Sequence, residues 1–245
     1  MLTILRGLTL VATVLLAVQA GVVARLLRRG APRPILVGWL VVAVVFVASA
    51  LNTAVLDGAA LGGLVVPEWA GALQAARAAI YDAGYLGGRV LHVVLPSLLL
   101  FVFVQWPRGR WLGVGVAACA VVIGFVGFAA PGMTDWERLL GTGRALSVLA
   151  ILMYLLLSAL FLLSQLPLLD RYLGGTVLAA TALQLAAPVP MLFLRAGSDV
   201  PAVWIVLQAL YLLTALVQLV FVWRARLALR EGGVSQLLRR APALG

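Results

Sequence analysis

Long apolar runs alternate with short polar breaks along the chain. A helix that crosses a bilayer needs about 20 mainly apolar residues, and a window of about 19 residues finds seven runs of this kind. They are Leu8–Leu27, Ile35–Leu56, Val90–Trp106, Trp111–Ala130, Ala145–Gln165, Leu173–Leu194 and Val200–Trp223. The breaks carry proline, glycine, arginine and aspartate, which are typical of helix ends. The pattern predicts an all-α, polytopic membrane protein with seven transmembrane helices.

Two runs leave the number of spans open. The third run is short, and the sixth contains Pro188 and Pro190, so six and eight spans remain alternatives. Because proline lacks a backbone N–H, we expect the sixth helix to bend near Pro188.

The arginines predict the orientation. If successive breaks lie on opposite sides of the membrane, the whole net charge of +10 falls on one side. By the positive-inside rule this side is the cytoplasm, so the N-terminus is outside and the C-terminus inside. Seven arginines are therefore predicted to be topology anchors rather than ligands: Arg28, Arg29, Arg33, Arg108, Arg110, Arg224 and Arg226.

The same reading divides the chain into a transmembrane bundle, residues 1–223, and a basic cytoplasmic tail, residues 224–245. The longest break, Asp57–Gly88, contains a weakly amphipathic pattern at about 67–82 that begins with Pro67 and Glu68. Proline and an acid suit the first turn of a helix. We expect an outer helix here that caps the bundle or covers an outward pocket.

Composition agrees with a multi-pass protein of the cell inner membrane. Apolar residues make up 64% and charged residues 11%, against roughly half and a quarter in soluble domains. All 18 basic residues are arginine, so a retinal bound covalently through lysine is excluded. One histidine and one cysteine exclude bis-histidine haem and a thiolate metal cluster, and no metal site is predicted. The arginines are scattered over the breaks, so no nucleic acid is expected as a partner.

Polar residues inside the runs predict a ligand site. Trp204, Gln208 and Tyr211 are spaced by four and three residues and so share one helix face. With the predicted orientation, six residues lie in the outer half of the bundle or near its middle: Asn52, His92, Gln184, Trp204, Gln208 and Tyr211. They predict an outward-opening pocket. The alternative is that they are hydrogen-bonding groups that hold the helices together.

Enzymatic chemistry finds little support in the pattern. No apolar run carries two carboxylates, and no Ser-His-Asp grouping is plausible because the acids all lie in the breaks. The cofactor is unknown, and a noncovalently bound lipid, quinone or carotenoid stays open because each needs only an apolar groove.

One stretch resembles a known family. Residues Leu73–Leu112 resemble the third-helix region of the seven-helix N-terminal sensor module of bacterial histidine kinases and cyclases. The likeness rests on Tyr81, Gly84, Tyr85, Leu91, Pro96, Phe101, Phe103, Arg108, Arg110 and Trp111. Such modules continue into a cytoplasmic transmitter, whereas only about 22 residues follow Trp223 here. The resemblance implies a sensor module without its output domain.

These observations favour a seven-helix sensor or binding module that acts through partner membrane or cytoplasmic proteins. A small-molecule permease or a structural subunit of a larger membrane complex is the main alternative, and an intramembrane enzyme is the third. The lipid bilayer is a partner in every case.

Overall fold

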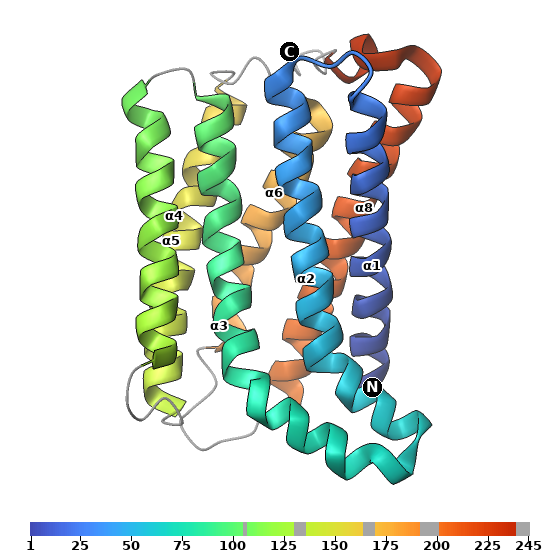
Figure 1. Cartoon of the computed structure of the whole chain (residues 1–245), viewed down its shortest axis with the longest axis vertical. Coiled ribbons are helices and arrows are strands. Elements are labelled where there is room, and N and C mark those ends of the chain that lie inside the picture. Colours follow the sequence, from blue (N-terminus) through green and yellow to red (C-terminus); the bar gives the residue numbers. More distant parts are fainter. Residues whose placement is uncertain (105–106, 130–135, 164–169, 192–200, 239–245) are drawn as a thin grey trace.

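The computed structural model describes residues 1–104, 107–129, 136–163, 170–191 and 201–238, which form a bundle of long helices (Figure 1). The elements in chain order are α1 (Leu2–Leu27), α2 (Arg33–Val65), the 3-10 turn η1 (Pro67–Trp69), α3 (Ala70–Phe103), α4 (Pro107–Ala129), α5 (Trp136–Leu162), α6 (Arg171–Ala186), α7 (Pro188–Met191) and α8 (Pro201–Leu238). Every element in these ranges is helical, which confirms the predicted all-α class.

Among the residues that the structure describes, six helices are long and apolar enough to cross a membrane. Their spanning segments are Leu2–Leu27, Arg33–Val55, Ala83–Phe103, Arg110–Gly127, Gly141–Leu162 and Pro201–Ser235. Large apolar side chains on them, such as Val44, Phe125 and Leu213, are exposed on the outer surface of the bundle, as expected where lipid covers a protein. The chain is therefore a multi-pass membrane protein.

The predicted sixth run differs from the other six. α6 has only 16 residues, which is about 24 Å of helix against about 30 Å of hydrocarbon. The helix is interrupted at Ala187 and resumes as α7 from Pro188, because proline cannot donate the next backbone hydrogen bond. This is the position where a distortion was expected, and it divides the run into two pieces. Residues 192–194, at the end of that run, lie outside the described residues.

Neighbouring helices pack into a closed ring. α1 packs on α2 and α8, α2 packs on α3, α3 packs on α4 and α5, and α6 lies between α5 and α8. α8 finishes at the opposite end of the bundle from the start of α1 (Figure 1). That end also holds the last turn of α1 and the first turns of α2, α4 and α6. We call it the arginine-rich end, after Arg25, Arg28, Arg29, Arg33, Arg110, Arg171, Arg224, Arg226 and Arg230.

The long predicted break is almost entirely helical in the structure. α2 continues to Val65, only Val66 and η1 make the turn, and α3 then enters the bundle without interruption. The outer helix expected at 67–82 is therefore the beginning of α3, and in Figure 1 it projects sideways at the end where α1 starts. The reason is local: alanine and leucine are the most frequent residues of α3 and favour helix, and α3 contains no proline before Pro96.

The tail is also more ordered than the sequence pattern predicts. α8 continues past Trp223 to Leu238, with a kink at Gly233, whose φ of 66° is in the left-handed region that glycine tolerates. The residues involved are largely alanine, leucine and arginine, which are good helix formers. Residues 239–245 of the predicted tail lie outside the described part.

α6 fits into the bundle because two of its glycines meet aromatic rings. A Cβ atom at Gly174 would collide with the ring of Phe161 on α5, and one at Gly175 with the ring of Phe221 on α8. Both neighbours can approach α6 closely only because these two positions lack side chains. Ten of its residues are buried, including Thr176, Thr181 and Gln184.

Candidate functional site

A cavity of about 290 Å³ lies inside the ring of helices, between α1, α2, α3, α5, α6 and α8. Five of the six predicted site residues line it together: Asn52, His92, Trp204, Gln208 and Tyr211. They come from three helices that are far apart in sequence. The sixth, Gln184, is buried on α6 but is not part of the lining.

One face of α8 forms a wall of the cavity. Trp204, Gln208, Tyr211, Ala215 and Gln218 all line it, at successive steps of four, three, four and three residues. At the far end of this row, Gln218 Nε2 donates to the carbonyl of Thr176 on α6 over 3.1 Å. The polar face seen in the sequence is thus a cavity wall with an interhelical hydrogen bond at its last member.

Other polar residues inside the spans serve packing instead. Ser158 on α5 and Thr181 on α6 share a hydrogen bond of 2.8 Å and are both buried. Neither lines the cavity. For this pair the alternative interpretation, interhelical hydrogen bonding, describes the contact.

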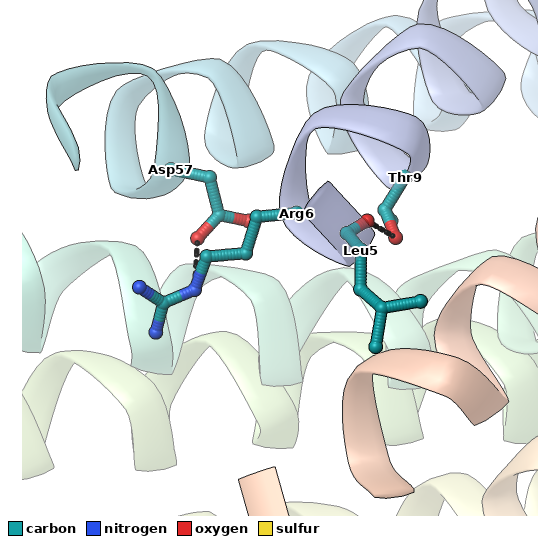
Figure 2. Close-up of polar contacts among 4 residues, drawn as sticks. All are labelled: Leu5, Arg6, Thr9 and Asp57. Carbon is teal, nitrogen blue, oxygen red and sulfur yellow. Dashed lines mark hydrogen bonds and ion pairs between the residues drawn. The ribbon is translucent and has the colours of Figure 1, made fainter. Parts of the chain in front are cut away.

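α1 supplies cavity residues that the sequence analysis did not propose. Arg6, Thr9 and Thr13 all line the cavity, and their spacing of three and four residues puts them on one face. The hydroxyl of Thr9 donates to the carbonyl of Leu5 over 2.8 Å (Figure 2), and that of Thr13 donates to its own helix in the same way. Because each hydroxyl proton is engaged, its oxygen can only accept a further hydrogen bond.

Charged residues line the end of the cavity that is opposite the arginine-rich end of the bundle. Arg6 Nε lies 3.4 Å from Asp57 Oδ1, an ion pair between α1 and α2 (Figure 2). The two side chains are 23% and 15% exposed, so the pair is only partly screened by solvent. Arg89 on α3 donates to Ser147 Oγ on α5 over 3.1 Å, and its guanidinium lies 5.3 Å from the centre of the Tyr85 ring. We call this end of the cavity, lined by Arg6, Asp57 and Arg89, the charged mouth.

Polarity falls with distance from the charged mouth. One turn farther along α3 from Arg89 lies His92, and the next turn contributes Leu95 to the lining. Leu16, Val45 and Tyr154 also line the cavity. The cavity is therefore charged at one end and lined at the other by apolar side chains together with Tyr154 and Gln218, which matches an amphipathic ligand.

A buried carboxylate lies beyond the deep end, at the start of α6. Asp170 Oδ1 accepts hydrogen bonds from the backbone N–H of Tyr172 and of Leu173 over 2.9 and 2.8 Å, and Oδ2 accepts one from Trp39 Nε1 over 2.7 Å. Burial raises the pKa of Asp170 from 3.8 to about 6, against the opposing effect of these donors and of Arg171. The signal was present in the sequence, since aspartate before a helix is a common N-cap, but its partner Trp39 is 131 positions away.

The predicted topology anchors all belong to the arginine-rich end. Arg28, Arg29, Arg33, Arg110 and Arg224 are exposed there. Arg226 is half-buried and donates to Gln19 Oε1 on α1 over 2.6 Å, so it also joins α8 to α1. The side chain of Arg108 lies outside the described residues.

In the described part of the chain, no three histidine, cysteine, aspartate or glutamate side chains come together as a metal site would require. Cys119 is exposed on α4. We compared the chain with protein-family models, with curated proteins and with solved structures, and none of the three comparisons gives a match.

Proposed function

We propose that this protein is a seven-pass receptor of the inner membrane that binds a small amphipathic molecule in its central cavity and acts through partner proteins. The cavity carries the proposal, because polar residues from α2, α3 and α8 line it together. If these residues served only to hydrogen-bond neighbouring helices, they would not be expected to line the same cavity as the charged mouth.

The seventh pass in this proposal is α6 together with α7. Six crossings would return the end of α8 to the side on which α1 starts, yet the two lie at opposite ends of the bundle (Figure 1). A short helix suffices here because α6 is covered by α5 and α8, so its ends need not reach the lipid surface. By the positive-inside rule the arginine-rich end faces the cytoplasm and the charged mouth faces outward.

Volume limits the ligand. The cavity holds about twice the roughly 150 Å³ of an engineered site that binds benzene. A molecule with one or two rings, or the ring of a quinone, matches this size, whereas the long polyene of a carotenoid does not. Gln208, Tyr211 and His92 supply hydrogen bonds to its polar atoms, and Phe46 and Trp204 supply apolar contact.

Action through a partner rests on α8. This helix carries seven cavity-lining positions from Trp204 to Gln218 and continues to Leu238 at the arginine-rich end. A ligand that shifts its outer half therefore also moves a surface that a cytoplasmic protein can contact. The resemblance of residues 73–112 to sensor modules also supports ligand binding in the bundle and signalling by a separate protein.

Native mass spectrometry of the chain purified in mild detergent tests the proposal. We expect a bound molecule of a few hundred daltons on the wild-type protein. Gln208→Leu, which removes a polar group from the cavity wall, and Ala215→Leu, which fills part of the volume, should each lower its occupancy at least fivefold. Gln74→Leu is the matched control, because Gln74 is exposed on α3 and does not line the cavity.

Two results would contradict the proposal. One is a wild-type protein without any bound molecule, and the other is equal occupancy in all four proteins. Proteoliposomes separate a receptor from a permease: binding without uptake of the identified molecule supports a receptor, and saturable uptake that Gln208→Leu abolishes shows a permease.

A further inference from the structure

A second hollow lies on the outer surface of the bundle, between α1 and α2. Its volume is about 420 Å³, and the central cavity does not share any of its lining residues. We call it the α1–α2 groove. Ala17, Ala24 and Ala43 form its buried floor, and Val44 and Val47 stand exposed at its edge. Small residues on both helices leave a furrow open to lipid.

Gly21 marks the open side of this furrow. A Cβ atom added there would meet nothing within 4 Å, so the space in front of Gly21 is not filled by the protein itself. At one end of the groove stand Arg25 and Arg28, both exposed. They belong to the arginine-rich end of the bundle.

The length of the groove matches one leaflet. From Ala17 to Arg28 the groove follows α1 for about 16 Å, about half of the roughly 30 Å hydrocarbon core. Its apolar part, from Ala17 to Ala24, covers about 10 Å of that depth, and Arg25 and Arg28 lie at the end of the groove that belongs to the arginine-rich end of the bundle.

We infer that the α1–α2 groove binds one anionic phospholipid, with an acyl chain over Gly21 and the phosphate between Arg25 and Arg28. Charge decides between a lipid and a helix of a partner protein. None of the residues that line the groove is acidic, so a packed apolar helix would bury two arginines without a carboxylate to pair with, which is costly. A lipid phosphate pairs with both guanidinium groups at the interface while its chain fills the furrow.

The full-length protein in nanodiscs with equal parts of phosphatidylglycerol and phosphatidylcholine provides the test, with native mass spectrometry to count the lipids that remain bound after transfer to detergent. We expect at least fivefold more bound phosphatidylglycerol than phosphatidylcholine. The double variant Arg25→Gln/Arg28→Gln should lower phosphatidylglycerol retention about tenfold. Arg29→Gln/Arg33→Gln removes the same charge from the same end, outside the groove, and should retain it.

A second pair of variants tests the furrow. Gly21→Leu fills it and should lower retention as much as the arginine variant does. Gly115→Leu is its control, because Gly115 is also exposed and an added Cβ atom there likewise meets nothing within 4 Å. Thermal unfolding in detergent verifies that each variant is folded.

Three results would overturn the inference. The first is equal retention of the two lipids, and the second is equal loss in a groove variant and its control. The third is a Val44→Cys variant that cross-links into dimers in a background with Cys119→Ala, because the occupant would then be a second copy of the chain. None of these results bears on the central cavity, which is tested separately.

Discussion

The indole of Trp39 on α2 donates a hydrogen bond of 2.7 Å to the carboxylate of Asp170, which caps α6. Trp39 is fully buried and Asp170 is 3% exposed. A single carboxylate thus satisfies two backbone donors of α6 and one side-chain donor of α2. The contact joins the first and second halves of the chain just beyond the deep end of the cavity.

Trp39→Phe should destabilise the protein by about 1 to 3 kcal/mol, because Oδ2 of the buried Asp170 then lacks its donor. Trp69→Phe is the control, since Trp69 is 64% exposed, and it should change stability by less than about 0.5 kcal/mol. Equilibrium unfolding in mixed micelles measures both. Equal effects of the two variants would mean that the indole hydrogen bond contributes nothing specific.

Asp170 also makes stability depend on pH. Its pKa is about 6 in the folded protein against an ordinary 3.8, so folding favours the protonated acid. The resulting stabilisation is fully present below about pH 4 and is lost as the pH rises through 6, for a total of about 3 kcal/mol. Unfolding measured from pH 4 to 7.5 should show this decline, and Asp170→Asn, which keeps the cap oxygen, should remove it. Parallel profiles for the two proteins would refute the assignment.

Gly175→Ala should destabilise the protein by about 1 to 3 kcal/mol, because the new methyl group meets the ring of Phe221. Phe221→Leu in the same chain should recover part of that loss, which a double-mutant cycle measures. Gly115→Ala adds the same methyl group where nothing lies within 4 Å and should be neutral or slightly stabilising. Strict additivity of the Gly175 and Phe221 changes would show that the two do not interact.

The ion pair at the charged mouth should be weak but measurable. A double-mutant cycle with Arg6→Gln and Asp57→Asn is expected to give a coupling of about 0.5 to 1 kcal/mol, because the pair is only partly buried. The coupling should fall at high salt, where partly exposed charges are screened. Glu68→Gln, at an exposed position on η1, should show no coupling to Arg6. A coupling that is unchanged by salt would contradict the solvent-screened geometry.

The proposed orientation is open to labelling in intact cells. In a background with Cys119→Ala, Gly71→Cys should react with an impermeant maleimide from outside, whereas Ser235→Cys should react only after the cells are opened. Both positions are exposed, on α3 and α8 respectively. Labelling of the Ser235 site and protection of the Gly71 site would reverse the orientation.

The sequence predicts much of this fold because lipid exposure demands apolar runs of fixed length. Helix ends are less well predicted, since Asp57–Val65 and the residues after Trp223 are helical without being apolar enough for a span. An apolar run of fixed length predicts α6 less well than the other helices. It is buried among other helices, so neither its length nor its polarity pattern follows the rule for lipid-facing spans.

The candidate site divides in the same way. Helical spacing predicts the α8 stripe, and polarity together with the predicted orientation predicts Asn52 and His92, which line the same cavity. Arg6, Thr9 and Thr13 obey the same spacing, but a span that begins at Leu8 leaves Arg6 in the outer segment. Gln184 is proposed from the sequence as a polar residue inside an apolar run, but α6 is buried on most sides, and spacing cannot tell which buried side faces a cavity. The pairing of Trp39 with Asp170 depends on tertiary structure alone.

The short, largely protein-covered α6 has a consequence for biogenesis. A helix that carries buried Thr176, Thr181 and Gln184 and is too short to span the hydrocarbon by itself gains little from leaving the translocon alone. Thr176 receives its hydrogen bond from Gln218, which is synthesised later than α6. If α6 is the seventh pass, we therefore expect its stable integration to follow the emergence of α8. In a chain truncated before α8, we expect α6 to remain in the translocon.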